Sequence, residues 1–244
     1  MALHEAFGTL LSPWTGDPPA EVVAASGVVT STIERMVDHK QAHPADDLVT
    51  GLVQASEGDD RLTRKELLST VFQLVVAGHD TTTSLIGSSV VALVDHPDQL
   101  AALRADPTRL PAAVEELLRF TVPVPHGTFR YATEPVEVDG HTFPAGKQVL
   151  VCLGAANRDA AVFTDPHRLD LDRDTKGHLA FGHGMHFCLG APLARLEGRI
   201  ALGALLARYA DISLAVPRDE LHWGHGDGLV LRGLGALPVQ LTPA

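Results

Sequence analysis

Apolar positions in the first half of the chain recur at the spacing of helices. Across residues 19–40 they fall three or four positions apart, which is typical of one helical face. A second, shorter helical segment is predicted over residues 44–58. Further helices are expected to begin at Pro97 and Pro111, because proline fits the first turn of a helix. The pattern therefore predicts a largely helical first half.

The longest of these segments begins with a capping box. Thr63 is followed three residues later by Glu66, so that each side chain can bond the backbone N–H of the other at the helix start. Apolar residues then continue to about His96 without favouring one face. Since a helix that is apolar all round is normally buried on all sides, residues 63–96 are predicted to form a central helix.

The pattern changes in the second half, where shorter apolar runs alternate with turn residues. Asp139-Gly140 is typical of a β-hairpin turn, and a helix is predicted to follow a glycine-rich loop and to end near Arg208. No repeat or linker interrupts the chain, so residues 1–244 are predicted to form one domain of mainly α class with small β-sheets (α+β). Short strands are expected at residues 136–138, 149–151, 212–216, 230–231 and 239–241.

Charge and composition exclude several classes of protein. There are 19 Lys and Arg residues against 30 Asp and Glu, and the net charge of −11 disfavours binding to nucleic acid. The 45% of apolar residues argues against disorder, and two cysteines are too few for a disulfide framework. No membrane-spanning run and no targeting signal is recognisable, so the sequence predicts a cytoplasmic protein without a membrane partner.

The most informative stretch is the run F-G-H-G-M-H-F-C-L-G at residues 181–190. Its glycines permit a tight loop close to a flat ligand, and Cys188 lies where the N–H groups of a following helix favour a thiolate. A cysteine thiolate is one of the few axial ligands of haem iron. Two alternatives remain at this point: an inert, packed cysteine, or zinc held by His183, His186 and Cys188, which lacks a fourth ligand at a usual spacing.

This run resembles, position for position, the haem-binding loop F-G-x-G-x-H-x-C-x-G of the cytochrome P450 family. Residues 77–82 (A-G-H-D-T-T) resemble the A-G-x-D/E-T motif of the family's central helix, and residues 116–119 resemble its E-x-x-R helix. Residues 157–173 are similar to the stretch that leads to the haem loop. The resemblance covers nearly the whole chain, whereas roughly the first two-fifths of a complete family member has no counterpart in it.

The resemblance implies a P450-like fold whose N-terminal part is missing, and haem b (iron protoporphyrin IX) as cofactor with Cys188 as the iron ligand. It implies that Asp80 and Thr81 are the catalytic acid–alcohol pair, which supplies protons when dioxygen is cleaved. It assigns a structural role to Glu116 and Arg119, with Arg173 as their third partner. The other haem contacts that it implies are Arg130 and His186 at the propionates, Phe181, Gly182 and Gly190 in the loop, and Ala77 and Gly78 in the central helix.

These roles have physical reasons, and some of the residues also allow a purely structural interpretation. Gly78 costs a buried helix about 1 kcal/mol relative to alanine, so its missing side chain should leave room for a ligand. The Thr81 hydroxyl can turn back to the carbonyl of Ala77 and loosen the helix. Alternatively, Asp80 is a satisfied buried carboxylate and Arg130 forms an ordinary surface salt bridge. The second cysteine, Cys152, is expected to pack in the core.

The resemblance implies a haem-thiolate monooxygenase that inserts one oxygen atom of dioxygen into a small organic substrate. Because no nucleotide-binding fingerprint is present, its electrons would come from NAD(P)H through a ferredoxin-type partner with its reductase. Peroxide as oxidant is a near alternative, against which Asp80 and Thr81 argue. A truncated, non-catalytic homologue that acts as a haem-binding or interaction module is the second hypothesis. The missing part is expected to leave apolar surface exposed, which favours a missing N-terminal segment or self-association as partner.

Overall fold

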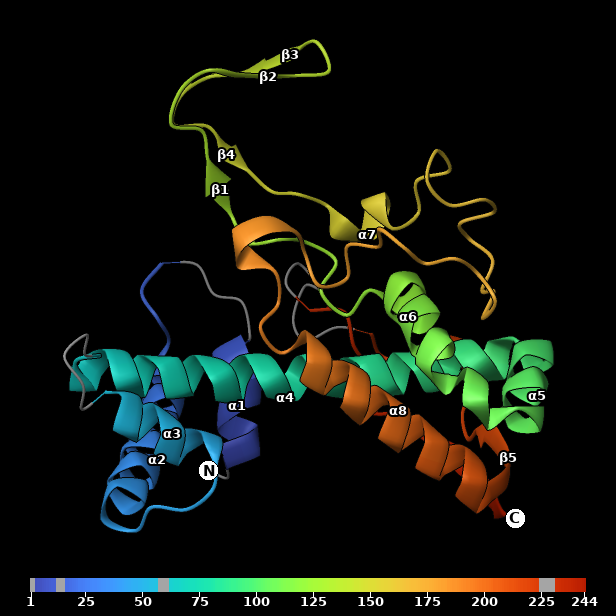
Figure 1. Ribbon diagram of the computed structural model, residues 1–244, viewed down its shortest axis with the longest axis horizontal. Coiled ribbons are helices and arrows are strands. Elements are labelled where there is room, and N and C mark those ends of the chain that lie inside the picture. The colour runs from blue at the N-terminus through green and yellow to red at the C-terminus, as the bar shows by residue number, and fades with distance from the viewer. Residues whose placement is uncertain (1–2, 12–15, 57–61, 224–230) are drawn as a thin grey trace. The chain divides into compact units, whose positions relative to one another are not determined.

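The computed structural model describes residues 3–11, 16–56, 62–223 and 231–244 of the chain (Figure 1). These residues group into two compact units, and the boundary between the units lies inside helix α4 (Arg64–Asp95). Of the described residues, those up to Asp80 form the first unit and those from Thr81 onward form the second. The expected single domain stays a prediction.

The first unit is helical. It contains α1 (Leu3–Leu11), α2 (Ala20–Ala42), α3 (Leu48–Ala55) and the N-terminal half of α4. The start of α3 is fixed by Asp47, whose carboxylate accepts a hydrogen bond of 2.9 Å from the N–H of Thr50. Val29 and Ile33 of α2 pack into one core with Leu67 of α4. The helices predicted over residues 19–40 and 44–58 correspond to α2 and α3, while α1 was not predicted.

Helix α4 begins with the capping box that the sequence predicts. The Thr63 N–H and hydroxyl donate to Glu66 Oε2 over 2.7 and 2.8 Å, and the Glu66 N–H donates to Thr63 Oγ1 over 3.3 Å. Most side chains at residues 84–93 are buried, as expected of a central helix. The prediction of burial on every face is wrong for the N-terminal half, because α2 and α3 cover only the side that carries Leu67 and Val71.

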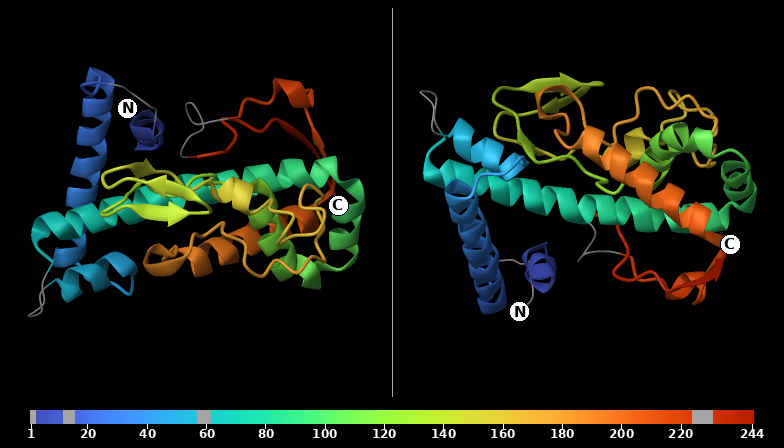
Figure 2. Two further views of the ribbon diagram at one scale, coloured as in Figure 1. Left: turned by 90° about the horizontal axis from the view of Figure 1, so that it is seen from above. Right: turned by 60° about the horizontal axis from the view of Figure 1, so that its bottom comes forward.

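The second unit packs helices around the C-terminal half of α4 (Figure 2). They are α5 (Pro97–Ala105), α6 (Leu110–Thr121), the short α7 (Leu153–Ala156) and α8 (Ala191–Arg208). Leu85, Leu117 and Leu202 belong to their common core. A Cβ at Gly198 would lie 3.4 Å from side-chain carbons of Leu85 and Val114, so the glycine lets α8 come close to both α4 and α6.

Among its described residues, this unit also contains three small antiparallel sheets of two strands each. Strand β1 (Arg130–Tyr131) pairs with β4 (Gln148–Val149), β2 (Val136–Val138) with β3 (His141–Phe143), and β5 (Tyr209–Leu214) with β6 (Val239–Pro243). The turn between β2 and β3 has positive φ at Asp139 (49°) and Gly140 (74°), which confirms the predicted hairpin. The expected class, mainly α with small β-sheets, is confirmed. Of the strand expected at residues 230–231, Val230 lies outside the described residues.

The expectation for Cys152 is wrong, because its side chain is exposed rather than packed in the core. Strand β4 ends at Val149, and Cys152 forms an isolated bridge with His126 before capping α7. The apolar run at residues 149–151 therefore does not continue as a buried strand. In the described ranges, no helix has the length and hydropathy needed to cross a membrane.

Candidate functional site

The loop that precedes α8 is closed by backbone hydrogen bonds. The Cys188 N–H donates to the Phe181 carbonyl over 2.9 Å, so the two ends of the predicted cofactor loop meet. Between them, Gly182 and Gly184 have φ of 73° and 76°, a region that side chains rarely enter. The Phe187 N–H closes the intervening 3-10 turn on the Gly184 carbonyl over 3.0 Å. The loop thus needs its glycines for shape, as the sequence predicts.

Cys188 lies at the end of this loop with an exposed side chain. Its carbonyl accepts the N–H of Ala191, the first residue of α8, over 3.2 Å. A Cβ at position 190 would lie 3.9 Å from Cys188 Sγ, so Gly190 leaves space beside the sulfur. The alternative of an inert, buried thiol does not match this exposure.

Apolar side chains around the thiol are exposed as well. Met185 is 94% exposed, Leu189 85% and Phe187 50%. Exposure of several large apolar groups around one soft ligand suits a flat apolar cofactor whose metal accepts a thiolate. The residues of this loop therefore fit haem. A zinc site formed by His183, His186 and Cys188 is not supported, since no three metal-ligating side chains gather in the described part of the chain.

The two residues predicted to bind propionates are both exposed. Arg130 lies on β1, and its Nη1 donates to the carbonyls of Thr128 and Phe129 over 3.2 and 3.1 Å and to the Thr128 hydroxyl. Among the described residues Arg130 forms no ion pair, so the alternative of a surface salt bridge is not observed there. His186 ends the 3-10 turn Gly184–His186 of the cofactor loop. Their contacts with a propionate stay predictions.

The predicted oxygen-activating residues are consecutive positions of α4. Ala77 and Gly78 are exposed, and a Cβ at Gly78 would meet nothing within 4 Å, so this turn of the helix is open. Asp80 is only 6% exposed, and its Oδ2 is buried without a hydrogen-bond partner among the described residues. The interpretation of Asp80 as a fully satisfied carboxylate is therefore not supported. Thr81 is half-buried, and its predicted bond to the Ala77 carbonyl stays a prediction.

An ion cluster built on the fully buried Glu116 and Arg119 holds the segment that leads to the loop. The Arg119 Nε and Nη2 donate to the two carboxylate oxygens of Glu116 over 2.6 and 2.7 Å, and Arg173 Nε donates to Glu116 over 3.2 Å. Arg119 Nη1 also donates to the carbonyls of Asn157 and Pro166 over 2.8 and 2.9 Å. The predicted grouping of Glu116, Arg119 and Arg173 is confirmed. Its contacts tie α6 to residues 157–173 and support a structural role.

A second charged cluster was missed by the sequence analysis. Arg195 of α8 donates from Nε and Nη2 to the Glu115 carboxylate over 2.7 and 2.9 Å, and His178 Nε2 lies 3.0 Å from Glu115 Oε2. Burial raises the pKa of Glu115, but the hydrogen bonds from His178 and Arg195 outweigh it and lower the pKa to about 2. The hydrogen bond to Glu115 raises the pKa of Arg195. These residues are 63 and 80 positions from Glu115, so no local spacing in the sequence could have revealed them.

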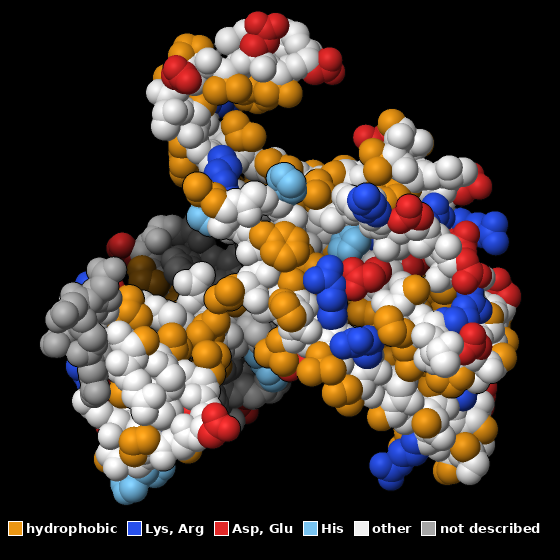
Figure 3. Space-filling view, viewed as in Figure 1, with side chains coloured by type: hydrophobic (Ala, Val, Ile, Leu, Met, Phe, Trp, Pro, Cys, Tyr) orange, Lys and Arg blue, Asp and Glu red, His pale blue; other side chains and the backbone are white. Residues whose placement is uncertain are grey.

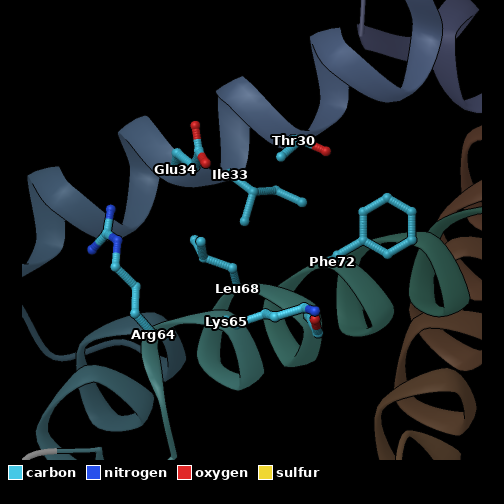
Figure 4. A pocket seen from close by; sticks show the side chains of 8 residues that line it. Thr30, Ile33, Glu34, Arg64, Lys65, Leu68 and Phe72 are labelled. Carbon is cyan, nitrogen blue, oxygen red and sulfur yellow. The ribbon is translucent and has the colours of Figure 1, made fainter. Parts of the chain in front are cut away.

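A cavity of about 560 Å³ lies in the first unit, between α2 and α4 (Figure 4). Its wall is apolar at Ile33, Leu68 and Phe72, and the charged side chains of Arg64 and Lys65 also border it. Arg64 already pairs with a carboxylate of α2 over 2.6 Å. Since none of the predicted site residues lines this cavity, it gives no support to the predicted cofactor site.

Comparison with known proteins gives a consistent family relationship. The family model "Cytochrome P450" matches residues 24–110 and 108–230. The chain is 51% identical to the cytochrome P450 monooxygenase PikC of Streptomyces venezuelae and 47% identical to 6-deoxyerythronolide B hydroxylase of Saccharopolyspora erythraea. These matches cover 92% and 89% of this chain, but only 54% and 53% of the two relatives. The chain thus spans about half the length of these curated relatives.

A solved structure gives the same result for the fold. The Bacillus subtilis bacillaene polyketide synthase cytochrome P450 PksS superposes with a TM-score of 0.89 at 39% identity. The superposition covers 98% of this chain and 61% of that one. The expected P450-like fold, represented in part, is confirmed.

Proposed function

Since the chain belongs to the cytochrome P450 family, whose members bind haem b, we propose that it is the haem-bearing portion of a monooxygenase. It would insert one oxygen atom of dioxygen into a small organic molecule. The observation that carries the proposal is the exposed thiol of Cys188, in a glycine-shaped loop with exposed apolar neighbours, directly before α8. Relatives named as a monooxygenase and a hydroxylase support the reaction class.

Each predicted residue has a role in this proposal. Haem, when bound, supplies an iron that binds and activates dioxygen. The Cys188 Sγ would be its protein ligand, and Arg130 and His186 would donate to the propionates. The loop residues Phe181, Gly182 and Gly190 and the open turn at Ala77 and Gly78 would border the ring.

Asp80 and Thr81 would handle protons. The Asp80 Oδ2 is buried and has no partner in the described ranges, so this oxygen can take up a proton without first breaking a hydrogen bond. A hydroxyl such as that of Thr81 both donates and accepts, which lets it pass a proton onward. The pair would therefore supply protons at the site of oxygen chemistry.

Electrons would come from NAD(P)H through a ferredoxin-type donor and its reductase. Support for this partner comes from the family relationship, together with the lack of a nucleotide-binding fingerprint in the sequence. The proposed substrate class, a small organic molecule, is supported by the relatives, one of which is named a polyketide biosynthesis cytochrome P450. The cytoplasmic location stays a prediction from the sequence.

The ligand assignment is tested by loading the chain with haem and recording the spectrum of the reduced, carbon monoxide-bound form. We expect the red-shifted Soret band of thiolate ligation, and we expect Cys188→Ala to lose it. Cys152→Ala is the matched control, because Cys152 is the other exposed cysteine and should leave the band unchanged. Survival of the band in Cys188→Ala, or its absence in the unchanged chain, would refute the assignment.

A second candidate is a non-catalytic haem-binding or interaction module. The chain spans about half the length of the relatives it matches, so haem binding and turnover by this chain are measured separately. Haem stoichiometry and turnover with reduced ferredoxin separate the two candidates. Full haem occupancy with no oxygenated product, both alone and after addition of candidate partner polypeptides, would favour the module.

A further inference from the structure

We propose that Glu115 is a positioning residue for Cys188, acting through His178 and Arg195 on the two sides of the cofactor loop. This inference rests on the proposed function of Cys188 as the haem ligand. Glu115 lies on α6, His178 lies just before the loop and Arg195 lies on α8 just after it. One carboxylate thus connects both flanks of residues 181–190, a role that nothing in the family motifs assigns to it.

The hydrogen bonds of His178 define which of its two ring nitrogens carries the hydrogen. The Ala180 N–H donates to His178 Nδ1 over 3.2 Å, so Nδ1 is an acceptor and Nε2 carries the hydrogen of the neutral ring. That Nε2–H donates to Glu115 Oε2 over 3.0 Å. The His178 side chain is only 8% exposed, so little water competes for these bonds. Glu115 therefore fixes the backbone immediately before Phe181.

The arginine side reaches the thiol through an aromatic ring. Arg195 is held in two-pronged contact with Glu115, and its guanidinium carbon lies 4.6 Å from the centre of the Phe181 ring. The Phe181 carbonyl in turn accepts the Cys188 N–H over 2.9 Å. Glu115 orients Arg195, Arg195 covers Phe181, and the Phe181 backbone holds Cys188.

The same contacts give Glu115 an electrostatic role. The hydrogen bond to Glu115 raises the pKa of Arg195 most, burial opposes this rise, and charge attraction to Glu115 and then to Cys188 adds to it, so Arg195 lies within electrostatic reach of Cys188. As long as Glu115 pairs with Arg195, their charges cancel beside the thiolate. Loss of Glu115 leaves an uncompensated cation there, and loss of Arg195 leaves an uncompensated anion. These changes should move the reduction potential of bound haem in opposite directions.

The first experiment needs no haem. Amide hydrogen exchange at residues 179–188 is compared in Glu115→Ala and in Glu137→Ala, a control at an exposed position of the β2–β3 hairpin. We expect exchange in Glu115→Ala to be faster by about five- to thirtyfold, the factor for one or two lost hydrogen bonds. Unchanged protection at Gly182 and Cys188 would overturn the proposal. Glu115→Gln keeps the side-chain volume and serves in the same comparison if the alanine variant does not fold.

The second experiment uses the haem-loaded chain. We expect Glu115→Gln to raise the reduction potential, Arg195→Leu to lower it, and the double variant to lie near the unchanged chain. Shifts of the same sign, or no shift, would overturn the electrostatic role, because general loosening of the loop has no reason to reverse sign. Absence of a thiolate spectrum in the unchanged chain would refute the proposed function instead, and the exchange experiment would still decide whether Glu115 holds Cys188.

Discussion

Removal of the Glu116 charge should strongly destabilise the second unit. Glu116 and Arg119 are both fully buried, and Glu116 accepts hydrogen bonds from Arg119, from Arg173 and from the N–H of Asp170 over 3.1 Å. Glu116→Gln keeps the shape of the side chain but leaves the Arg119 cation without its counterion. It also replaces one accepting oxygen by a donor that faces other donors.

The expected magnitude follows from these contacts. Breaking a buried ion pair by removing one partner costs about 3–5 kcal/mol. The loss is a large fraction of the roughly 5–15 kcal/mol by which a whole domain is stable. Arg119→Met should be comparably harmful, since Arg119 also serves the buried carbonyls of Asn157 and Pro166, and an unsatisfied buried group costs about 1–3 kcal/mol. Because the two variants damage the same cluster, the double variant should lose less than the sum of both.

Urea unfolding followed by circular dichroism measures these losses. Glu137→Gln is the matched control, because Glu137 is exposed on β2, and a surface change there should stay within about 0.5 kcal/mol. A loss below about 1 kcal/mol in Glu116→Gln would refute the reasoning. It would mean that water or a neighbouring charge satisfies Arg119 in the variant.

Three further outcomes are expected. Gly27→Ala should raise the melting temperature, because Gly27 is an exposed residue in the interior of α2 and a new Cβ there would meet nothing within 4 Å. Gly233→Ala should lower the melting temperature, because its Cβ would lie 2.1 Å from Ser84 Oγ. Shifts of the same sign in both variants would contradict this reasoning. The pKa of Glu115 is lowered from 4.5 to about 2, so its stabilising effect is complete above pH 4.5 and is lost as the pH falls toward 2. When the urea midpoint of unfolding is measured at decreasing pH, the midpoint of Glu115→Gln should therefore fall less steeply over that window than the midpoint of the unchanged chain. Ile200 is 62% exposed on α8, so Ile200→Lys should reduce self-association in light scattering, and an unchanged particle size would argue that this surface does not associate.

The helices that the sequence predicts best are those with local signals. Thr63 and Glu66 predict the start of α4, and the expected hydrogen bonds between them are formed. Cys152 was misjudged because an apolar run reads alike in a buried strand and in an exposed connection. Only the two pairs Arg130–Val149 and Tyr131–Gln148 join β1 to β4, and this pairing ends before Cys152.

In the candidate site, too, the residues with local sequence signals were predicted and those with distant partners were not. Cys188 and its glycines were found because the loop is contiguous in the sequence. Arg119 and Glu116 were found because they are three residues apart on one helix. Glu115 was overlooked because its partners come from residue 178 and residue 195, and only the fold brings them together. Long-range electrostatic pairs of this kind leave no periodic trace in one sequence.

Several of the predicted functional residues break rules of stability. Gly78 forgoes about 1 kcal/mol in a helix interior, and nothing nearby requires the space that it leaves. Asp80 keeps a buried oxygen unpaired among the described residues, although such a group costs about 1–3 kcal/mol. On the face of the second unit that Figure 3 displays, hydrophobic side chains lie in the open, and Leu189 beside Cys188 is 85% exposed. A sequence selected only for stability would remove all three features. Their persistence at Ala77–Thr81 and around Cys188 is physically reasonable if a bound, apolar, oxygen-activating cofactor is what they accommodate.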